Sequence, residues 1–304
     1  MGRLFETLIE QAGKLGPAVV AVAEGYDPAA LEAIAEASAR GFVRAELVGP
    51  RKKIEKALSS VDVPRNSVEI VDSETPGESA AKAVELVRTG RASILMKGKI
   101  QTSVLLRAVL DKERGLRAGR VLSHTAALEV PGFNRFIFVA DGGVNIAPDL
   151  ERKIGIVENA IEVARTLGVQ EPRVALICAV EIPGADYPAT LDAAIIAKMA
   201  ERGAFPGAIV DGPLALDVAI SPESALIKGV GGPVAGKADV LITPDITSGN
   251  TLAKSMQYFA GALMGGVITG ASRPIVVISR ADTAQVKTCS LAMARCLVQE
   301  PAGG

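Results

Sequence analysis

Near the end of this chain, an apolar β-branched run leads directly into a hydroxyl, a guanidinium and a carboxylate: Val276-Val277-Ile278-Ser279-Arg280-Ala281-Asp282. Apolar runs of this kind are typical of strands buried on both faces of a parallel sheet. Ligands bind just beyond the carboxyl ends of such strands, so we expect chemistry at these three polar side chains. Arginine presents a planar donor fork that suits phosphate, and Asp282 can cap the next helix or act as a base.

Strand-like and helix-like segments alternate through the part of the chain that precedes this run. Predicted strands at 17–23, 43–48, 68–71 and 92–96 are followed by predicted helices at 28–40, 52–58, 76–88 and 102–112. Such a βαβ series predicts an α/β fold with a doubly wound, mostly parallel sheet. Two strand-like segments at 120–130 and 133–139, joined by the turn signal Pro131-Gly132, then break the alternation, and we expect a domain boundary near them.

The second half of the chain resumes the alternation. We expect helices at 150–167, 189–201, 222–228 and 283–297, strands at 174–180, 208–211, 240–243 and 274–278, and a Gly249-Asn250 turn before a helix that begins at Thr251. The glycine-rich segment 259–270 is either core or an interface. The predicted organisation is a first α/β domain of residues 1–135 plus 270–304 and a second α/β domain of residues 136–269.

Composition argues against several classes of function. Of the 304 residues, 49% are hydrophobic and 22% charged, which predicts a large core. Aromatic residues make up 3% and the net charge is -1, so neither stacking platforms nor basic patches for nucleic acid are expected. No stretch approaches the roughly 20 apolar residues that span a bilayer. The three cysteines fit no metal spacing and indicate a reducing, cytoplasmic setting.

Two loops at predicted strand ends carry candidate binding residues. In the first, Lys97, Gly98, Lys99 and Thr102 precede a helix, where amides and lysines would attract a phosphate or CoA; the alternative is ordinary capping by Thr102. In the second, Ser248, Gly249 and Asn250 follow a strand and offer hydroxyl, amide and flexible backbone, again with a plain helix cap as the alternative. The loop from Asp141 to Asn145 follows a strand as well, and it is either a ligand contact or a structural turn.

Three other patterns point to structure rather than chemistry. The segment 231–238 nearly matches a P-loop, but Ala238 replaces the hydroxyl that would bind Mg²⁺ and a strand follows where a helix is needed. Asp211 and Asp217 lack a third ligand nearby for a metal site. His124 is the one histidine, no G-x-S-x-G motif surrounds any serine, and a structural role for this histidine is expected.

Read together, these segments resemble the phosphate acetyltransferase/phosphate butyryltransferase family from about residue 92 onward. The resemblance is carried by Asp211-Gly-Pro-Leu-Ala-Leu-Asp217, Pro233-Val-Ala-Gly-Lys-Ala-Asp239, Pro244-Asp245 with Gly249-Asn250, and Ser279-Arg280. Val180-Glu181 and the segment 188–192 resemble the butyryl branch more than the acetyl branch.

The resemblance implies two α/β domains of the three-layer αβα, isocitrate/isopropylmalate dehydrogenase-like architecture, with the active site in the interdomain cleft and a homodimeric assembly. It implies transfer of a short acyl group, butyryl or acetyl, between coenzyme A and inorganic phosphate, without a metal or a permanently bound cofactor. Ser279 and Arg280 match the family's cleft pair, and Arg107 matches its arginine on the helix after the threonine-containing loop. Asp282 is the nearest candidate for the catalytic carboxylate, and Asn145, Ser248, Gly249 and Asn250 are expected to contact substrate.

Two other functions are compatible with the sequence. A dehydrogenase could use a related two-domain scaffold, although no G-x-G-x-x-G follows the first predicted strand and no carboxylate cluster suggests a metal. A CoA- or acyl-phosphate-binding regulatory module could keep the same pocket without turnover. The sequence leaves the acyl chain length and the physiological direction open.

Overall fold

The structure is a computed structural model that describes residues 2–279 and 281–298. Its internal contacts divide the chain into two compact units. Unit 1 comprises Met1–Arg120 with Met264–Gly304, and unit 2 comprises Val121–Leu263. Both units are built from strands and helices in alternation, so the α/β class that the sequence predicts is confirmed.

Unit 1 holds a mostly parallel sheet whose strand order reverses beside its first strand. The order is β3 (Val68–Asp72), β2 (Val43–Gly49), β1 (Ala18–Ala23), β4 (Ile94–Lys97), β11 (Ile275–Val276) and β10 (Leu263–Thr269). Only the β10–β11 pair among these described strands is antiparallel. Because the chain runs outward from β1 to β3 and then returns to β4, the carboxyl ends of β1 and β4 flank a topological switch point, where α/β sheets bind ligands.

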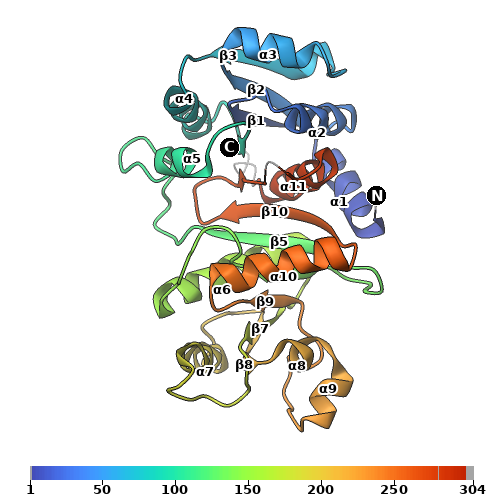
Figure 1. Cartoon of the computed structure of the whole chain (residues 1–304), viewed down its shortest axis with the longest axis vertical. Helices are drawn as coiled ribbons and strands as arrows, with labels where there is room; N and C mark the ends of the chain where they lie inside the picture. Colours follow the sequence, from blue (N-terminus) through green and yellow to red (C-terminus); the bar gives the residue numbers. More distant parts are fainter. Residues whose placement is uncertain (1, 280, 299–304) are drawn as a thin grey trace. The chain divides into compact units, whose positions relative to one another are not determined.

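Helices cover both sides of the unit 1 strands, with α1, α2 and α11 on one side and α4 and α5 on the other (Figure 1). Their bounds are α1 Arg3–Lys14, α2 Pro28–Ala39, α3 Arg51–Leu58, α4 Pro76–Arg88, α5 Thr102–Val109 and α11 Ala284–Leu297, with a short 3₁₀ turn at Arg65–Ser67. Proline opens α2 and α4 at the position where its missing N–H costs nothing. Coverage on both sides explains why β1 is almost entirely buried.

In unit 2 the strand order in the sheet is β5 (Ser123–Glu129), β6 (Ile137–Ala140), β9 (Val240–Ile242), β7 (Arg173–Ile177) and β8 (Ile209–Leu214). The β5–β6 pair is antiparallel and the remaining pairs are parallel. Its helices are α6 Leu150–Thr166, α7 Pro188–Glu201, α8 Leu216–Ile220, α9 Pro222–Ile227 and α10 Ile246–Phe259. The carboxyl ends of β6 and β9 lie at one edge of this sheet, because Ala140 pairs with Ile242 in parallel register.

The core is mostly aliphatic, as the composition predicts, and three aromatic side chains, Phe5, Phe42 and Phe138, are fully buried within it. Within residues 2–279 and 281–298, no helix combines the length and the apolar character needed to cross a bilayer. Burial of these many small and branched side chains is the main source of stability in a fold of this kind.

Several predicted boundaries are wrong, and each has a local cause. The helix expected from Thr251 begins five residues earlier, at Ile246, because Asp245 caps it by accepting the Ser248 amide, so Gly249-Asn250 is helical rather than a turn. The helix expected to reach Lys112 ends at Val109, since the Asp111 carboxylate binds the amides of the next turn.

The segments on either side of Gly270 also differ from expectation. The strand expected over 274–278 is only Ile275–Val276, because the chain beyond it turns into the Ser279 loop. The glycine-rich segment 259–270 contains β10, whose residues after Leu263 are all buried. In β10, Gly265 leaves no room for a side chain, since a Cβ there would lie 2.8 Å from the sulfur of Met293.

Candidate active site

The residues that follow β11 form a tight turn that presents a hydroxyl to solvent. Ser279 is exposed, and its amide donates to Oδ2 of Asp282 at 3.0 Å. The Asp282 amide donates back to the Ser279 carbonyl, and Ser279 Oγ accepts the Ala281 amide. Arg280 lies outside the described residues. Because Asp282 is only 5% exposed, its carboxylate holds the backbone at Ser279 from within the protein.

A buried lysine supports this turn from α11. Lys287 is 2% exposed, and its Nζ donates to the Asp282 carbonyl at 2.7 Å. The same ammonium lies 3.8 Å from Oδ2 of Asp27, the residue that precedes α2. A buried ammonium is costly unless it is paired and hydrogen-bonded. The Lys287 contacts therefore tie the Ser279 turn to two helices of unit 1.

The loop after β4 lies next to the loop after β11, because these strands are parallel neighbours. Lys97 is buried, and its Nζ donates to the Ile278 carbonyl at 3.5 Å, so this lysine supports the approach to Ser279. Gly98 has no space for a side chain, since a Cβ would lie 2.3 Å from the Glu24 carbonyl oxygen. Lys99 is exposed beyond it. The two lysines of this loop therefore differ in environment, because Lys97 is buried and Lys99 is exposed to solvent.

The start of α5 has the features of an anion site. Thr102 is the first helical residue, and no side-chain cap binds the helix N-terminus within the described chain, so the ordinary-capping interpretation of Thr102 is not supported. Uncapped N-terminal amides and the helix dipole favour a bound phosphate. Arg107 lies later on α5 and is exposed.

In unit 2, the loop after β6 is organised by one buried carboxylate. Asp141 accepts the amides of Gly143 and Val144 on Oδ1 and the amide of Asn145 on Oδ2. The Asn145 side chain donates to Oδ2 of Asp141 and to the Leu122 carbonyl, at 2.6 and 2.8 Å. The side-chain nitrogen of Asn145, Nδ2, therefore fixes the loop. The side-chain oxygen, Oδ1, is the atom of this amide that can bind a ligand.

The start of α10 lies against the same loop. Asn250 donates to the Gly142 carbonyl at 3.1 Å, and a Cβ on Gly249 would lie 2.5 Å from the Asp141 carbonyl oxygen. Ser248 binds its cap, Asp245, through both amide and hydroxyl. The structure therefore brings together Asn145, Ser248, Gly249 and Asn250. The acidic cap makes this helix end a poorer anion site than the start of α5.

Two features escaped the sequence analysis. Glu24 and Tyr26 follow β1 at the switch point of unit 1, where the strand-end rule that singled out Lys97 would have found them. His124 was expected to be structural, and it lies beside the glycine loop of unit 2: a Cβ on Gly143 would come within 3.1 Å of its side chain.

The cysteines and carboxylates do not supply a metal site in the described chain. Cys178, Cys289 and Cys296 are free thiols. Burial raises the pKa of Cys178 and of Cys296 to about 11, which keeps both thiols protonated near neutral pH. Among residues 2–279 and 281–298, no group of three or more His, Cys, Asp or Glu side chains is placed to hold a metal ion.

Comparison of the chain with known proteins identifies its family. Residues 75–294 match the family described as phosphate acetyl/butaryl transferase, and the chain belongs to that family. It is 45% identical to the phosphate butyryltransferase of Clostridium acetobutylicum over 275 residues, which cover 90% of this chain and 91% of the relative.

Two further relatives extend the comparison. The chain is 42% identical to the phosphate acetyltransferase of Rhizobium meliloti, over 95% of this chain and 92% of that protein. It superposes with a TM-score of 0.81 on the crystal structure of a branched-chain phosphotransacylase from Enterococcus faecalis V583, at 34% identity, covering 93% of this chain and 100% of the other. The family predicted from the sequence is confirmed.

Proposed function

We propose that this protein transfers a short-chain acyl group reversibly between coenzyme A and inorganic phosphate. Toward acyl phosphate, a phosphate oxygen attacks the thioester carbonyl, and the tetrahedral intermediate expels the CoA thiolate, which takes up a proton. In reverse, the thiol loses its proton, sulfur attacks the carbonyl of the acyl phosphate, and the C–O bond to phosphate breaks. Besides family membership, the observation that carries the proposal is the exposed Ser279 hydroxyl on a turn held by buried Asp282 and Lys287.

The proposed roles follow from the chemistry of each group. Ser279 donates to the carbonyl oxygen or to phosphate as negative charge develops, the kind of donor whose loss costs about 10²–10³ in rate. Arg280 binds phosphate through two N–H groups and offsets that charge. Asp282 is the candidate base for the CoA thiol. Its anchoring of the Ser279 amide gives it a positioning role as well, and the two roles are separable by substitution.

Asp282→Asn separates proton transfer from positioning. An asparagine oxygen can still accept the Ser279 amide but cannot take the thiol proton, so loss of kcat together with the acidic limb of the pH–rate profile is expected if Asp282 is the base. Asp282→Ala removes both functions. An Asp282→Asn enzyme with an unchanged pH profile and rate would assign Asp282 to positioning alone.

Binding is proposed to involve two groups of residues. The first group is Lys97, Gly98, Lys99 and Thr102 on the loop that leads into α5, together with Arg107 on α5 itself. The N-cap of this helix makes no side-chain hydrogen bond, which suits the binding of phosphate groups. The loop edge of unit 2, with Asn145, Ser248, Gly249 and Asn250, offers one amide oxygen, a hydroxyl and close backbone approach, and we propose that it contacts CoA. CoA is a dissociable co-substrate in this scheme, no metal has a role, and the enzyme is proposed to be a cytoplasmic homodimer.

The test is release of free CoA from acetyl-, propionyl-, butyryl- and isobutyryl-CoA, with and without inorganic phosphate, followed with a thiol reagent. Phosphate-dependent release is expected, and the ranking of rates identifies the acyl group, since one methylene is worth roughly 1–3 kcal/mol in a fitted pocket. Ser279→Ala is expected to lower kcat about 10²–10³-fold. The matched control is Ser60→Ala, because Ser60 is an exposed serine of unit 1 whose hydroxyl donates to the Ala57 carbonyl at the end of its own helix.

Two results would contradict this proposal. CoA binding without phosphate-dependent release from any thioester would favour the regulatory module. Trapping of an acylated Ser279 from acyl phosphate alone would replace direct transfer by a covalent acyl-enzyme.

A further inference from the structure

A buried ammonium lies at the start of α11, directly beneath the Ser279 turn. Lys287 is 2% exposed, and its Nζ donates to the Asp282 carbonyl at 2.7 Å. Burying an ammonium is costly unless it is paired and hydrogen-bonded, and an apolar side chain often fills such a space with no loss of stability. Packing alone therefore does not account for a lysine at this position, and its contacts indicate what the charged group does.

The turn that Lys287 contacts presents the Ser279 hydroxyl as a hydrogen-bond donor. The Ser279 amide donates to Oδ2 of Asp282 at 3.0 Å, and the Asp282 amide donates to the Ser279 carbonyl at 3.1 Å. Ser279 Oγ accepts the Ala281 amide at 3.3 Å. Because that amide occupies one lone pair of the oxygen, the hydroxyl proton is directed to a partner outside the turn. Lys287 holds the carbonyl of the residue whose carboxylate sets this geometry.

The second partner of Lys287 is a carboxylate at the start of α2. Asp27 occupies the N-cap position of that helix, where an aspartate commonly accepts an amide of the first turn. Its side chain makes no such cap hydrogen bond, and its Oδ2 lies 3.8 Å from Lys287 Nζ. The carboxylate thus faces the ammonium of another helix, and Lys287 is held between the start of α2 and the Ser279 turn.

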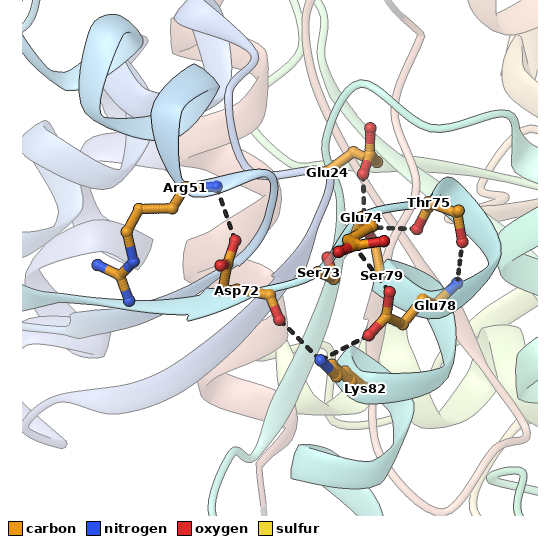
Figure 2. Close-up of polar contacts among 9 residues, drawn as sticks. All are labelled: Glu24, Arg51, Asp72, Ser73, Glu74, Thr75, Glu78, Ser79 and Lys82. Atoms are coloured by element: carbon orange, nitrogen blue, oxygen red, sulfur yellow. Dashed lines mark hydrogen bonds and ion pairs between the residues drawn. The ribbon is translucent and has the colours of Figure 1, made fainter.

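The loop that carries Asp27 is anchored in turn by a strained, buried glutamate. Glu24 directly follows β1, is 3% exposed, and has a φ of 55°, which makes it the one non-glycine residue in the left-handed region within the described chain. Its Oε1 accepts the Ser79 hydroxyl at 2.5 Å (Figure 2), and its Oε2 accepts the Tyr26 hydroxyl at 2.6 Å. Strain of this kind persists only where surrounding contacts impose it. Asp27 therefore projects from a fixed loop of the unit 1 sheet.

We propose that Lys287 is a positioning residue for acyl transfer, whose ammonium, held by Asp27, fixes the turn so that the Ser279 hydroxyl is aligned with the negative charge that develops on the substrate. Lys287 is buried and acts through Asp282 and Ser279. The inference rests on the proposed function, because it assigns Ser279 to that reaction. A misplacement of about 1 Å can cost on the order of 10²-fold in rate, so the effect of Lys287 falls on kcat.

The kinetic test uses two variants of one helix. Lys287→Met removes the ammonium and keeps an unbranched side chain; kcat is expected to fall about 10–50-fold, with KM for acyl-CoA and for phosphate within about twofold. The matched control is Arg295→Met, because Arg295 is also a buried cation of α11, and its guanidinium donates to the carbonyls of Gly16 and Leu15. Both variants should lower the unfolding midpoint, and below both midpoints only Lys287→Met should lower kcat.

A milder variant covers the case in which Lys287→Met does not fold. Asp27→Asn keeps the shape of the side chain and removes the charge that faces the ammonium, so kcat is expected to fall about threefold with KM unchanged. A rise in KM at unchanged kcat in either variant would overturn the proposal, since it would assign these residues to substrate binding.

A double-mutant cycle identifies the path by which Lys287 acts. In the Ser279→Ala background the hydroxyl that Lys287 positions is absent, so adding Lys287→Met is expected to lower kcat less than about threefold further. Equal fold losses in the wild-type and Ser279→Ala backgrounds would overturn the proposal, because the lysine would then act independently of Ser279.

Hydrogen exchange tests the turn without turnover and separates this inference from the proposed function. Lys287→Met is expected to speed exchange in a peptide that contains Ser279 and Asp282, whose amides are bonded within the turn, and Arg295→Met is expected to leave that peptide unchanged. Faster exchange in a protein that does not transfer acyl groups would overturn the proposed function and keep Lys287 as the residue that orders the turn. Unchanged exchange in Lys287→Met would overturn the inference whether or not the protein transfers acyl groups.

Discussion

Replacing Gly98 by alanine tests how tightly the loops after β1 and β4 fit. The new Cβ would lie 2.3 Å from the Glu24 carbonyl oxygen, 2.7 Å from that of Ala23 and 2.8 Å from the Glu24 carbonyl carbon. These are backbone atoms that cannot rotate away, so the loops must separate. The cost combines overpacking, about 1–3 kcal/mol, with weakening of the two hydrogen bonds from the Gly98 and Lys99 amides, about 1 kcal/mol each. The expected loss is therefore about 3–5 kcal/mol.

Thermal unfolding followed by circular dichroism measures this loss. For a unit of this size, 1 kcal/mol corresponds to about 2–4 °C, so the midpoint is expected to fall by about 6–20 °C. Gly77→Ala is the matched control, because Gly77 lies exposed in the first turn of α4 with nothing within 4 Å of its would-be Cβ, and alanine there should leave the midpoint unchanged or raise it slightly. Equal midpoints for Gly98→Ala and Gly77→Ala would refute the argument that the two backbones touch.

Three other predictions concern groups whose environments the structure defines. Asp141→Ala removes the acceptor of three backbone amides and should lower the free energy of unfolding by about 2–3 kcal/mol. The control, Asp149→Ala, removes an exposed helix cap and should lower it by roughly 1 kcal/mol. Equal unfolding midpoints for the two variants would contradict the structural role of Asp141. Burial raises the pKa of Cys178 and Cys296 to about 11, so both should react slowly with thiol reagents in the native protein near pH 8, and rapid native labelling would contradict their burial. Burial, together with the hydrogen bond to Glu24, raises the pKa of Tyr26 from its ordinary value of 10.0 to about 12. The folded state therefore binds the phenolic proton more tightly than the unfolded state does. The resulting stabilisation is present below pH 10 and is lost as the pH rises toward 12; the phenolate absorbance of wild type minus Tyr26→Phe should appear near pH 12, and a component that titrates at pH 10 in folded protein would contradict it.

Local patterns predicted much of the fold because strands and helices have different hydrophobic periods. The helix Pro76–Arg88 was predicted at both ends, since Thr75 caps it and proline opens it. Prediction failed where a cap lay inside an apparent loop: Asp245 starts α10 five residues before the expected helix, and Asp111 ends α5 early. In these cases the carboxylate of one short side chain accepts backbone amides and so sets the end of the helix, although the hydrophobic pattern of the neighbouring residues predicts a different end.

The sequence by itself determined the α/β class, the family, and the rule that polar residues after apolar strands are candidates for chemistry. Tertiary structure alone decided which of these residues meet. Lys97 contacts the carbonyl of Ile278, 181 residues away, and Glu24 contacts Ser79, 55 residues away. Such contacts depend on the order and register of strands in the completed sheet, and any window of sequence records only neighbours along the chain. The strand-end rule could have singled out Glu24 and Tyr26, which follow β1, but only the placement of β1 beside β4 shows that they lie against the loop after β4.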